Sequence, residues 1–157
     1  QRAGTYWYHP HPHEATARQV FMGLAGLFLV RDAEEQAHNL PSGNYEVPLV
    51  IQDKRFSGSS LMYNPSADEI MTGYLGETIL VNGVHSPVLA VETKWYRLRV
   101  VNGSTARVYQ LGFSNQQSFY LIGNDGGLLA TPEQLTTVML APGERADILI
   151  NFKDQPI

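Results

Sequence analysis

Short β-rich runs, separated by glycine and proline, are the feature that most constrains the fold of this chain. The runs are rich in β-branched and aromatic residues, and no long stretch has helical periodicity. The predicted strands are 5–9, 27–30, 47–52, 78–81, 95–101, 108–112, 119–122, 136–140 and 145–152. Many short strands with turn signals between them are typical of a sandwich or barrel. We therefore expect an all-β, Greek-key β-sandwich.

Alternation of apolar and polar residues is clearest in the fifth predicted strand. Tyr96, Leu98 and Val100 fall on one face of this strand. Arg97 and Arg99 fall on the other face. This pattern predicts a strand with one face in the core and with the arginine face in contact with water.

Composition divides the chain into three parts. Residues 32–43 are polar and contain proline and glycine, which is typical of a linker. Residues 1–31 contain only two predicted strands, which cannot bury a core, so we expect their partners to come from elsewhere. Residues 44–157 have enough predicted strands for a sandwich of their own, but no closing element follows the last one. We expect the chain to be a piece of a longer protein, incomplete at both ends.

Charge, hydropathy and cysteine content exclude several functions. The formal net charge is −4 and no basic run is present, so neither nucleic acid nor an anionic membrane surface is an expected partner. No apolar stretch approaches the roughly 20 residues that cross a bilayer. Cysteine is absent, which excludes a disulfide, a thiolate metal ligand and a cysteine nucleophile in this chain.

A histidine segment near the N-terminus carries the clearest sign of chemistry. His9, His11 and His13 alternate with Pro10 and Pro12 after an aromatic run. Side chains at positions i and i+2 of a strand share a face, so two imidazoles could chelate one metal ion or reach two adjacent ions. Imidazole suits copper, zinc, nickel and iron, and copper(II) binds most strongly among the divalent ions. The prolines place the segment at a strand end or sheet edge. Taken alone, the pattern also fits a surface accident or a tag-like remnant.

Motifs along the chain resemble the multicopper oxidase family. Residues 4–11, GTYWYHPH, followed by residues 19–27, QVFMGLAGL, resemble the end of domain 1 in that family. Copper-efflux oxidases and bacterial laccases look closest. The resemblance continues through domain 2, over residues 50–55, 76–83, 97–103, 125–127 and 142–147. It therefore covers nearly the whole chain and implies a cupredoxin-like sandwich over residues 44–157, preceded by the last strands of another cupredoxin domain.

The resemblance also implies roles for the histidines. His9 and His11 match ligands of the type 3 copper pair in a trinuclear cluster, one imidazole to each ion. His13 matches a histidine that is common in the subgroup, and we expect it to act beside the ligands or at the access route. His38 and His85 match no ligand and are expected to be solvated loop residues. The intact enzyme would take electrons from a phenol or a metal ion and reduce O2 to water.

Several family motifs are missing from the chain. Neither the family's His-Trp-His-Gly segment nor its domain 3 histidine motifs are present, and without cysteine no type 1 copper site can form. We therefore expect this chain to be inactive alone and to act with the remaining parts of domains 1 and 3, from the same protein or a second chain. The family implies a periplasmic or secreted location. The alternatives are a copper-free relative, as among cell-division proteins of this fold, and a stand-alone cupredoxin-like binding module.

Overall fold

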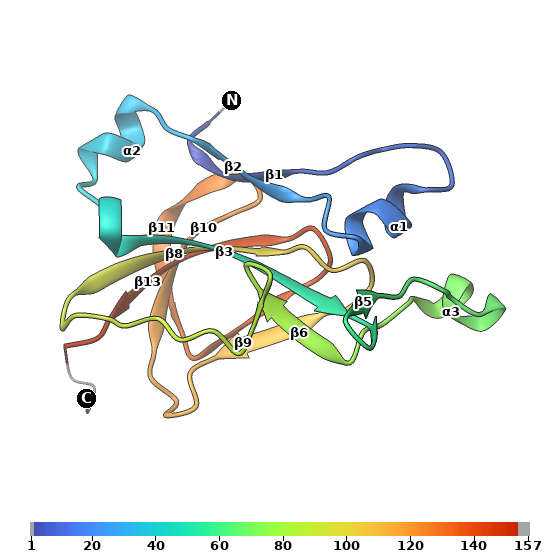
Figure 1. The fold of residues 1–157 in the computed structure, drawn as a ribbon. Helices are drawn as coiled ribbons and strands as arrows, with labels where there is room; N and C mark the ends of the chain where they lie inside the picture. The colour runs from blue at the N-terminus through green and yellow to red at the C-terminus, as the bar shows by residue number, and fades with distance from the viewer. Residues whose placement is uncertain (1, 154–157) are drawn as a thin grey trace.

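The chain folds mainly into β-strands, as predicted. The computed structural model describes residues 2–153, and strands hold 44% of the chain against 13% in helices. The strands are β1 (Gly4–Tyr8), β2 (Gly26–Val30), β3 (Glu46–Lys54), β4 (Phe56–Ser57), β5 (Ser60–Leu61), β6 (Thr78–Val81), β7 (Val84–His85), β8 (Trp95–Asn102), β9 (Tyr109–Gly112), β10 (Phe119–Asn124), β11 (Gly127–Leu135), β12 (Thr137–Leu140) and β13 (Arg145–Asn151). The helices are α1 (Thr16–Phe21), α2 (Ala33–Ala37), α3 (Ala67–Thr72) and the 3-10 helix η1 (Gly43–Tyr45) (Figure 1).

One large sheet organises the molecule. Its strand order is β11-β10-β13-β8-β3-β6-β7, and β8 runs antiparallel to β13 and parallel to β3. The apolar face of β8 and β13 packs against the two-stranded ribbon of β9 and β12 and forms the core of a sandwich. The buried residues of this core are Ile51, Tyr96, Val100, Tyr109, Phe119, Leu140, Ala146, Ile148 and Ile150.

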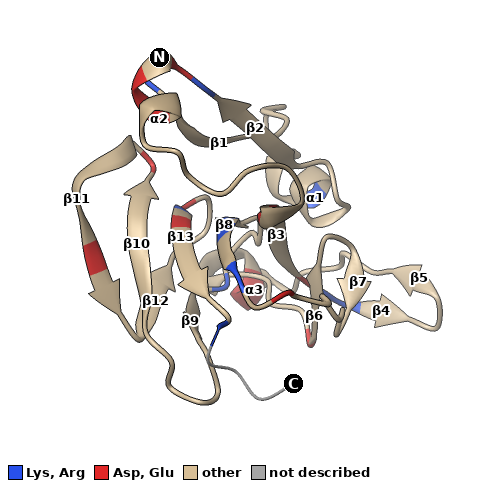
Figure 2. Cartoon of the chain, turned by 90° about the vertical axis from the view of Figure 1, so that its left-hand side faces the viewer, with Lys and Arg blue, Asp and Glu red and all other residues tan. Residues whose placement is uncertain are grey.

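The opposite face of the large sheet is also covered, which corrects one prediction. The antiparallel ribbon of β1 and β2 lies over it, with β1 in contact with β8, β10 and β13 (Figure 1). Arg97 is 1% exposed and Arg99 is 0% exposed, so the face predicted to meet water is buried. In Figure 2 the charged positions of β8 and β13 lie beneath the ribbon. Alternation identified the two faces of β8, but it could not show that both are covered.

Every strand predicted from the sequence is present, with ends shifted by a few residues. The longest strand that the sequence did not predict is β11, which lies at the edge of the large sheet and is mostly exposed. It contains Pro132, which an edge strand tolerates because its outer side needs no backbone donor. The three α-helices were also missed, since each is too short to show a helical period.

The segment predicted as a linker is partly ordered. Asp32 is the N-cap of α2, and its Oδ1 accepts a hydrogen bond from the Glu35 backbone N–H at 2.8 Å. The Glu35 side chain points into the protein and is buried. The division into residues 1–31, 32–43 and 44–157 remains a prediction. No helix within residues 2–153 is long and apolar enough to cross a membrane.

Candidate metal centre

The candidate ligands lie just beyond the end of β1. The strand ends at Tyr8. The prediction that His9 and His11 share a strand face is therefore wrong. Pro10 and Pro12 account for the early end, because neither can donate a hydrogen bond to a neighbouring strand. The two imidazoles nevertheless lie side by side, with ring centroids 4.2 Å apart and planes inclined by 36°. The spacing therefore brings them together without a strand.

The imidazole of His9 is held from two sides. The indole of Trp7 stacks on it, with centroids 4.3 Å apart and an angle of 28°. Its Nδ1 lies 3.1 Å from the Pro10 carbonyl oxygen. Since a carbonyl can only accept, a neutral imidazole makes this hydrogen bond in the tautomer with its proton on Nδ1, which leaves the lone pair on Nε2. A backbone carbonyl that fixes the tautomer in this way is a common support for a metal-binding histidine.

A cavity of about 280 Å³ opens beside His9. Its lining residues are Trp7, His9, Thr16, Ala17, Val20, Ser104, Thr105, Pro142 and Gly143. His11 is exposed and does not belong to this lining, so only one of the two imidazoles borders the cavity. Among residues 2–153, no group of three or more histidine and acidic side chains gathers closely enough to hold a metal ion. The described chain thus offers two imidazoles.

The other histidines stand apart from this pair. His13 is exposed, and its Nδ1 lies 3.8 Å from Glu14 Oε1 on the surface. His38 follows α2 and His85 lies in the short strand β7, and both are exposed as expected.

Upstream of His9, strand β1 is fixed to the large sheet through Thr5. The Thr5 hydroxyl accepts from Arg99 Nη1 at 3.1 Å, and its carbonyl accepts from Arg145 Nε at 3.0 Å. Thr5 is buried and lies four residues before His9. Two arginines of the large sheet, Arg99 and Arg145, therefore fix the position of β1, which leads into the histidine segment.

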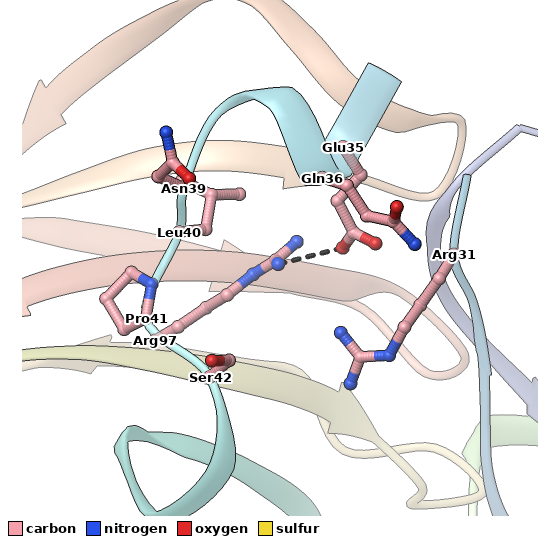
Figure 3. A pocket seen from close by; sticks show the side chains of 8 residues that line it. All are labelled: Arg31, Glu35, Gln36, Asn39, Leu40, Pro41, Ser42 and Arg97. Carbon is pink, nitrogen blue, oxygen red and sulfur yellow. Dashed lines mark ion pairs between the residues drawn. The ribbon is translucent and has the colours of Figure 1, made fainter. Parts of the chain in front are cut away.

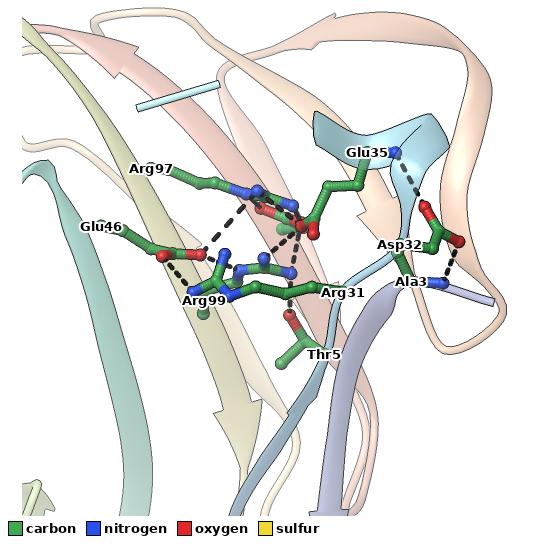
Figure 4. Close-up of polar contacts among 9 residues, drawn as sticks. Ala3, Thr5, Arg31, Asp32, Glu35, Glu46, Arg97 and Arg99 are labelled. Atoms are coloured by element: carbon green, nitrogen blue, oxygen red, sulfur yellow. Dashed lines mark hydrogen bonds and ion pairs between the residues drawn. The ribbon is translucent and has the colours of Figure 1, made fainter. Parts of the chain in front are cut away.

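Arg99 belongs to a buried ion-pair network beneath the ribbon (Figure 4). Glu35 Oε1 accepts from Arg97 Nη1 at 2.8 Å and from Arg99 Nη2 at 2.5 Å. Arg97 also makes a two-pronged contact with Asp147, at 2.9 and 2.6 Å. Arg99 Nε donates to Glu46 at 2.8 Å. Sequence reasoning missed this network, because Glu35 lies in a polar segment that reads as solvated.

The network shifts the pKa values of Glu46 and Arg97. Burial alone would raise the pKa of Glu46, but hydrogen bonds from Arg31 and Arg99 outweigh burial and hold it below its ordinary value. Burial would lower the pKa of Arg97, but its bonds with Asp147 outweigh burial and raise it. Glu46 and Arg97 are therefore both charged at neutral pH.

A cavity of about 350 Å³ borders the network. Its lining residues are Arg31, Glu35, Gln36, Asn39, Leu40, Pro41, Ser42 and Arg97 (Figure 3). Arg97 is paired with Glu35, and Arg31 is paired with Glu46 at 2.6 Å. The arginines in the lining are thus already compensated, and the cavity presents no free positive charge to a ligand.

Comparison with known proteins decides the family. Residues 4–157 match the sequence profile of the family described as "Multicopper oxidase". The chain belongs to the multicopper oxidase family. A multicopper oxidase of Staphylococcus haemolyticus is 42% identical over 152 residues, which cover 97% of this chain and 34% of that protein. The cell division protein FtsP of Xenorhabdus nematophila is also 42% identical, over 97% of this chain and 32% of its own length.

Solved structures of this multicopper oxidase family agree with the fold. The McoA multicopper oxidase of Aquifex aeolicus superposes with a TM-score of 0.91 at 44% identity, over 99% of this chain and 35% of that one. The cupredoxin-like fold predicted from the motifs is therefore confirmed. The chain spans about a third of the length of the relatives that it matches.

Proposed function

We propose that this chain is the part of a laccase-like multicopper oxidase that supplies two type 3 copper ligands, His9 and His11, and the scaffold between the copper-bearing domains. The longer protein would oxidise phenols or metal ions and reduce O2 to water. The observation that carries the proposal is the adjacency of the two imidazoles, with ring centroids 4.2 Å apart, within the residues that match the family profile.

The two histidines suit copper by their chemistry. Imidazole is a preferred ligand of copper, and the Pro10 carbonyl leaves Nε2 of His9 available for a metal ion. When bound, copper would supply the redox chemistry of O2 reduction. The protein's own share is to hold the imidazoles, through Trp7 on one side and the anchored strand β1 on the other. The type 1 site requires a cysteine thiolate, so another part of the protein must provide it.

Further parts of the same protein, or a second chain, are the partners that this proposal requires. The outer face of the β1–β2 ribbon exposes large apolar side chains, with Tyr8 63% and Phe28 55% exposed. Next to the ribbon, Leu24 is 55% exposed. Exposed apolar side chains that gather on one face are typical of a surface that another layer of the protein covers. We infer that the rest of domain 1 covers it, since the chain spans only a third of its relatives. A periplasmic or secreted location goes with this proposal.

Copper binding by the longer protein tests the proposal. His9→Ala and His11→Ala should each remove copper from the trinuclear cluster and abolish O2 consumption with a phenol or with Cu(I). His38→Ala and His85→Ala are matched controls, because both side chains are exposed and lie outside the motif, and they should keep the copper content and the rate. Unchanged copper content in the His9 variant would refute the assignment. The 157-residue chain alone should show no turnover.

A copper-free structural role is the second candidate. The similarity to the cell division protein FtsP, equal in identity to that of the oxidase relative, is the observation that favours it. Retention of both His9 and His11 favours the oxidase. If the longer protein with all its histidines intact takes up no copper, the structural role becomes the better explanation.

A further inference from the structure

Helix α1 follows the histidine segment directly and does not have the features of a self-supporting helix. It is six residues long, no side chain caps its N-terminus, and its first turn holds no acidic residue. Helices this short are unstable in isolation. Val20 and Phe21 are nevertheless buried, at 4% and 1% exposure. The position of α1 must therefore be set by the surface on which it lies.

Two side chains at the end of β3 hold the C-terminal end of α1. Lys54 Nζ donates to the carbonyl oxygen of Phe21 and, at 3.4 Å, to that of Val20. Gln52 Nε2 lies 3.4 Å from the same Val20 oxygen and donates to the Gly103 carbonyl at 3.0 Å. The last carbonyls of a helix lack partners within the helix and carry partial negative charge. An ammonium group at this end donates hydrogen bonds to the unpaired carbonyls and also brings a positive charge to the negative end of the helix.

Lys54 differs from the arginines of the buried network in how its charge is compensated. Its side chain is 3% exposed, yet it forms no ion pair with any carboxylate among residues 2–153. The neighbouring Asp53 directs Oδ2 to the Gly76 N–H at 2.7 Å and to Arg107 at 3.0 Å. The partners of the amine are therefore the helix carbonyls and the Phe21 ring, whose centroid lies 5.0 Å from Nζ. The lysine is placed to hold α1.

The position of α1 also determines one wall of the cavity beside His9. Thr16, Ala17 and Val20 of α1 line this cavity together with Ser104. Gln52 joins Val20 to Gly103, the residue before Ser104, so one side chain links two parts of the wall. The histidine segment thus runs between two fixed ends, β1 held by arginines and α1 held by Lys54.

We propose that Lys54, assisted by Gln52, is a positioning residue for the His9–His11 site: it fixes α1 and thereby the cavity wall and the downstream end of the histidine segment. The link to copper rests on the proposed function, whereas the link to α1 and His9 does not. Loss of the amine should loosen α1 and change the surroundings of the His9 imidazole while the sandwich stays folded.

The experiment compares the 157-residue chain with its Lys54→Met variant, which keeps much of the volume and removes the donor. Lys153→Met is the matched control, because that lysine is exposed. Amide hydrogen exchange of α1 and the NMR signals of the His9 imidazole are the readouts, with amides of β8 and β13 reporting global folding. We expect exchange in α1 to accelerate on the order of tenfold or more and the His9 signals to shift, with β8 and β13 still protected. Unchanged α1 exchange and His9 signals would overturn the proposal.

A second measurement needs no variant and decides the matter if Lys54→Met fails to fold. The α1 amide signals and the His9 imidazole signals of the wild-type chain are followed from pH 7 to 10, while the Lys54 amine loses its proton. The chemical shifts of the α1 amides and of the His9 imidazole should both change as Lys54 titrates. Asp53 is the charged group next to the Lys54 amine. If the amine titrates and neither set moves, the proposal is wrong. Failure of the longer protein to bind copper would refute the proposed function and leave these results standing.

Discussion

At the residue scale, the protein places cations in its interior in two ways. Arg97 and Arg99 are matched by carboxylates, so their charge is compensated in place. Lys54 is surrounded by backbone carbonyls, and burial lowers its pKa to about 8 from an ordinary value of 10.5. Buried arginine therefore stays charged at all accessible pH, whereas buried Lys54 titrates in the alkaline range.

Lys54 should give the chain a measurable pH dependence of stability. Because the folded-state pKa lies below the unfolded value, the unfolded chain binds more protons between about pH 8 and 10.5. The contribution of Lys54 to the free energy of unfolding therefore rises across this window, by up to about 3 kcal/mol, and is constant below it. Urea unfolding at pH 7.5 and pH 10 should show this rise in the wild type and lack it in Lys54→Met. Equal pH slopes in the two proteins would contradict the assignment.

Removal of one carboxylate should unbalance the arginine network. Glu35→Gln leaves Arg97 and Arg99 buried with less compensation, and breaking a buried pair in this way costs about 3–5 kcal/mol. Glu34→Gln is the matched control on the same helix, because the Glu34 side chain is 65% exposed and pairs only loosely with Arg2 at 3.8 Å. The control should change the free energy of unfolding by less than about 0.5 kcal/mol. Similar urea midpoints for the two variants would show that Glu35 contributes little to the stability of the buried network.

At the scale of elements, the turn before β13 supports strand β1. Gly143 has a φ of +82°, and a Cβ atom there would lie 3.0 Å from Cζ2 of Trp7. The turn at Ala141-Pro142-Gly143 thus has a second role, since its glycine lets the indole pack close to the backbone. The indole in turn stacks on His9. A turn residue far along the chain therefore contributes to the position of the candidate ligand.

Gly143→Ala should displace the Trp7 indole. The left-handed backbone at this position costs an alanine about 1–2 kcal/mol, and the added Cβ forces the indole to move by a few tenths of an ångström. Near-ultraviolet circular dichroism and tryptophan fluorescence should change, and the free energy of unfolding should fall. Gly126→Ala is the control, because its added Cβ would meet only Asn124 Oδ1 at 3.6 Å. The interpretation fails if the Gly143 variant keeps the wild-type spectrum and stability.

At the scale of the whole molecule, the ribbon's outer face distinguishes this chain from the longer protein. Phe28 is 55% exposed and pairs across the ribbon with Tyr6. In the isolated chain, Phe28→Ser should barely alter stability and should reduce self-association, because it removes part of an exposed apolar patch. In the longer protein, where we propose that this face is covered, the same change should cost about 2–4 kcal/mol. Val88→Ser, at a position that is 95% exposed, should be neutral in both. Equal effects of Phe28→Ser in both proteins would argue against a covered ribbon.

The sequence alone determined nine of the strands, the fold class and the adjacency of the two histidines. Strands such as β6 and β8 could be predicted because alternation and turn residues are local properties. The adjacency of His9 and His11 could be predicted because residues two apart in an extended chain lie close together, whereas their role as copper ligands stays a prediction. These features need no knowledge of distant residues.

Only the tertiary structure decided what covers each face and what holds the site. Arg99 alternates like a solvent-facing residue, yet a ribbon from the other end of the chain buries it, and its partner Glu35 lies 64 residues away. Lys54 likewise meets carbonyls more than 30 residues before it. Burial and charge pairing depend on segments that the fold brings together from far apart in the chain. A local pattern can therefore assign a residue to a face, but what lies against that face is a property of the folded molecule.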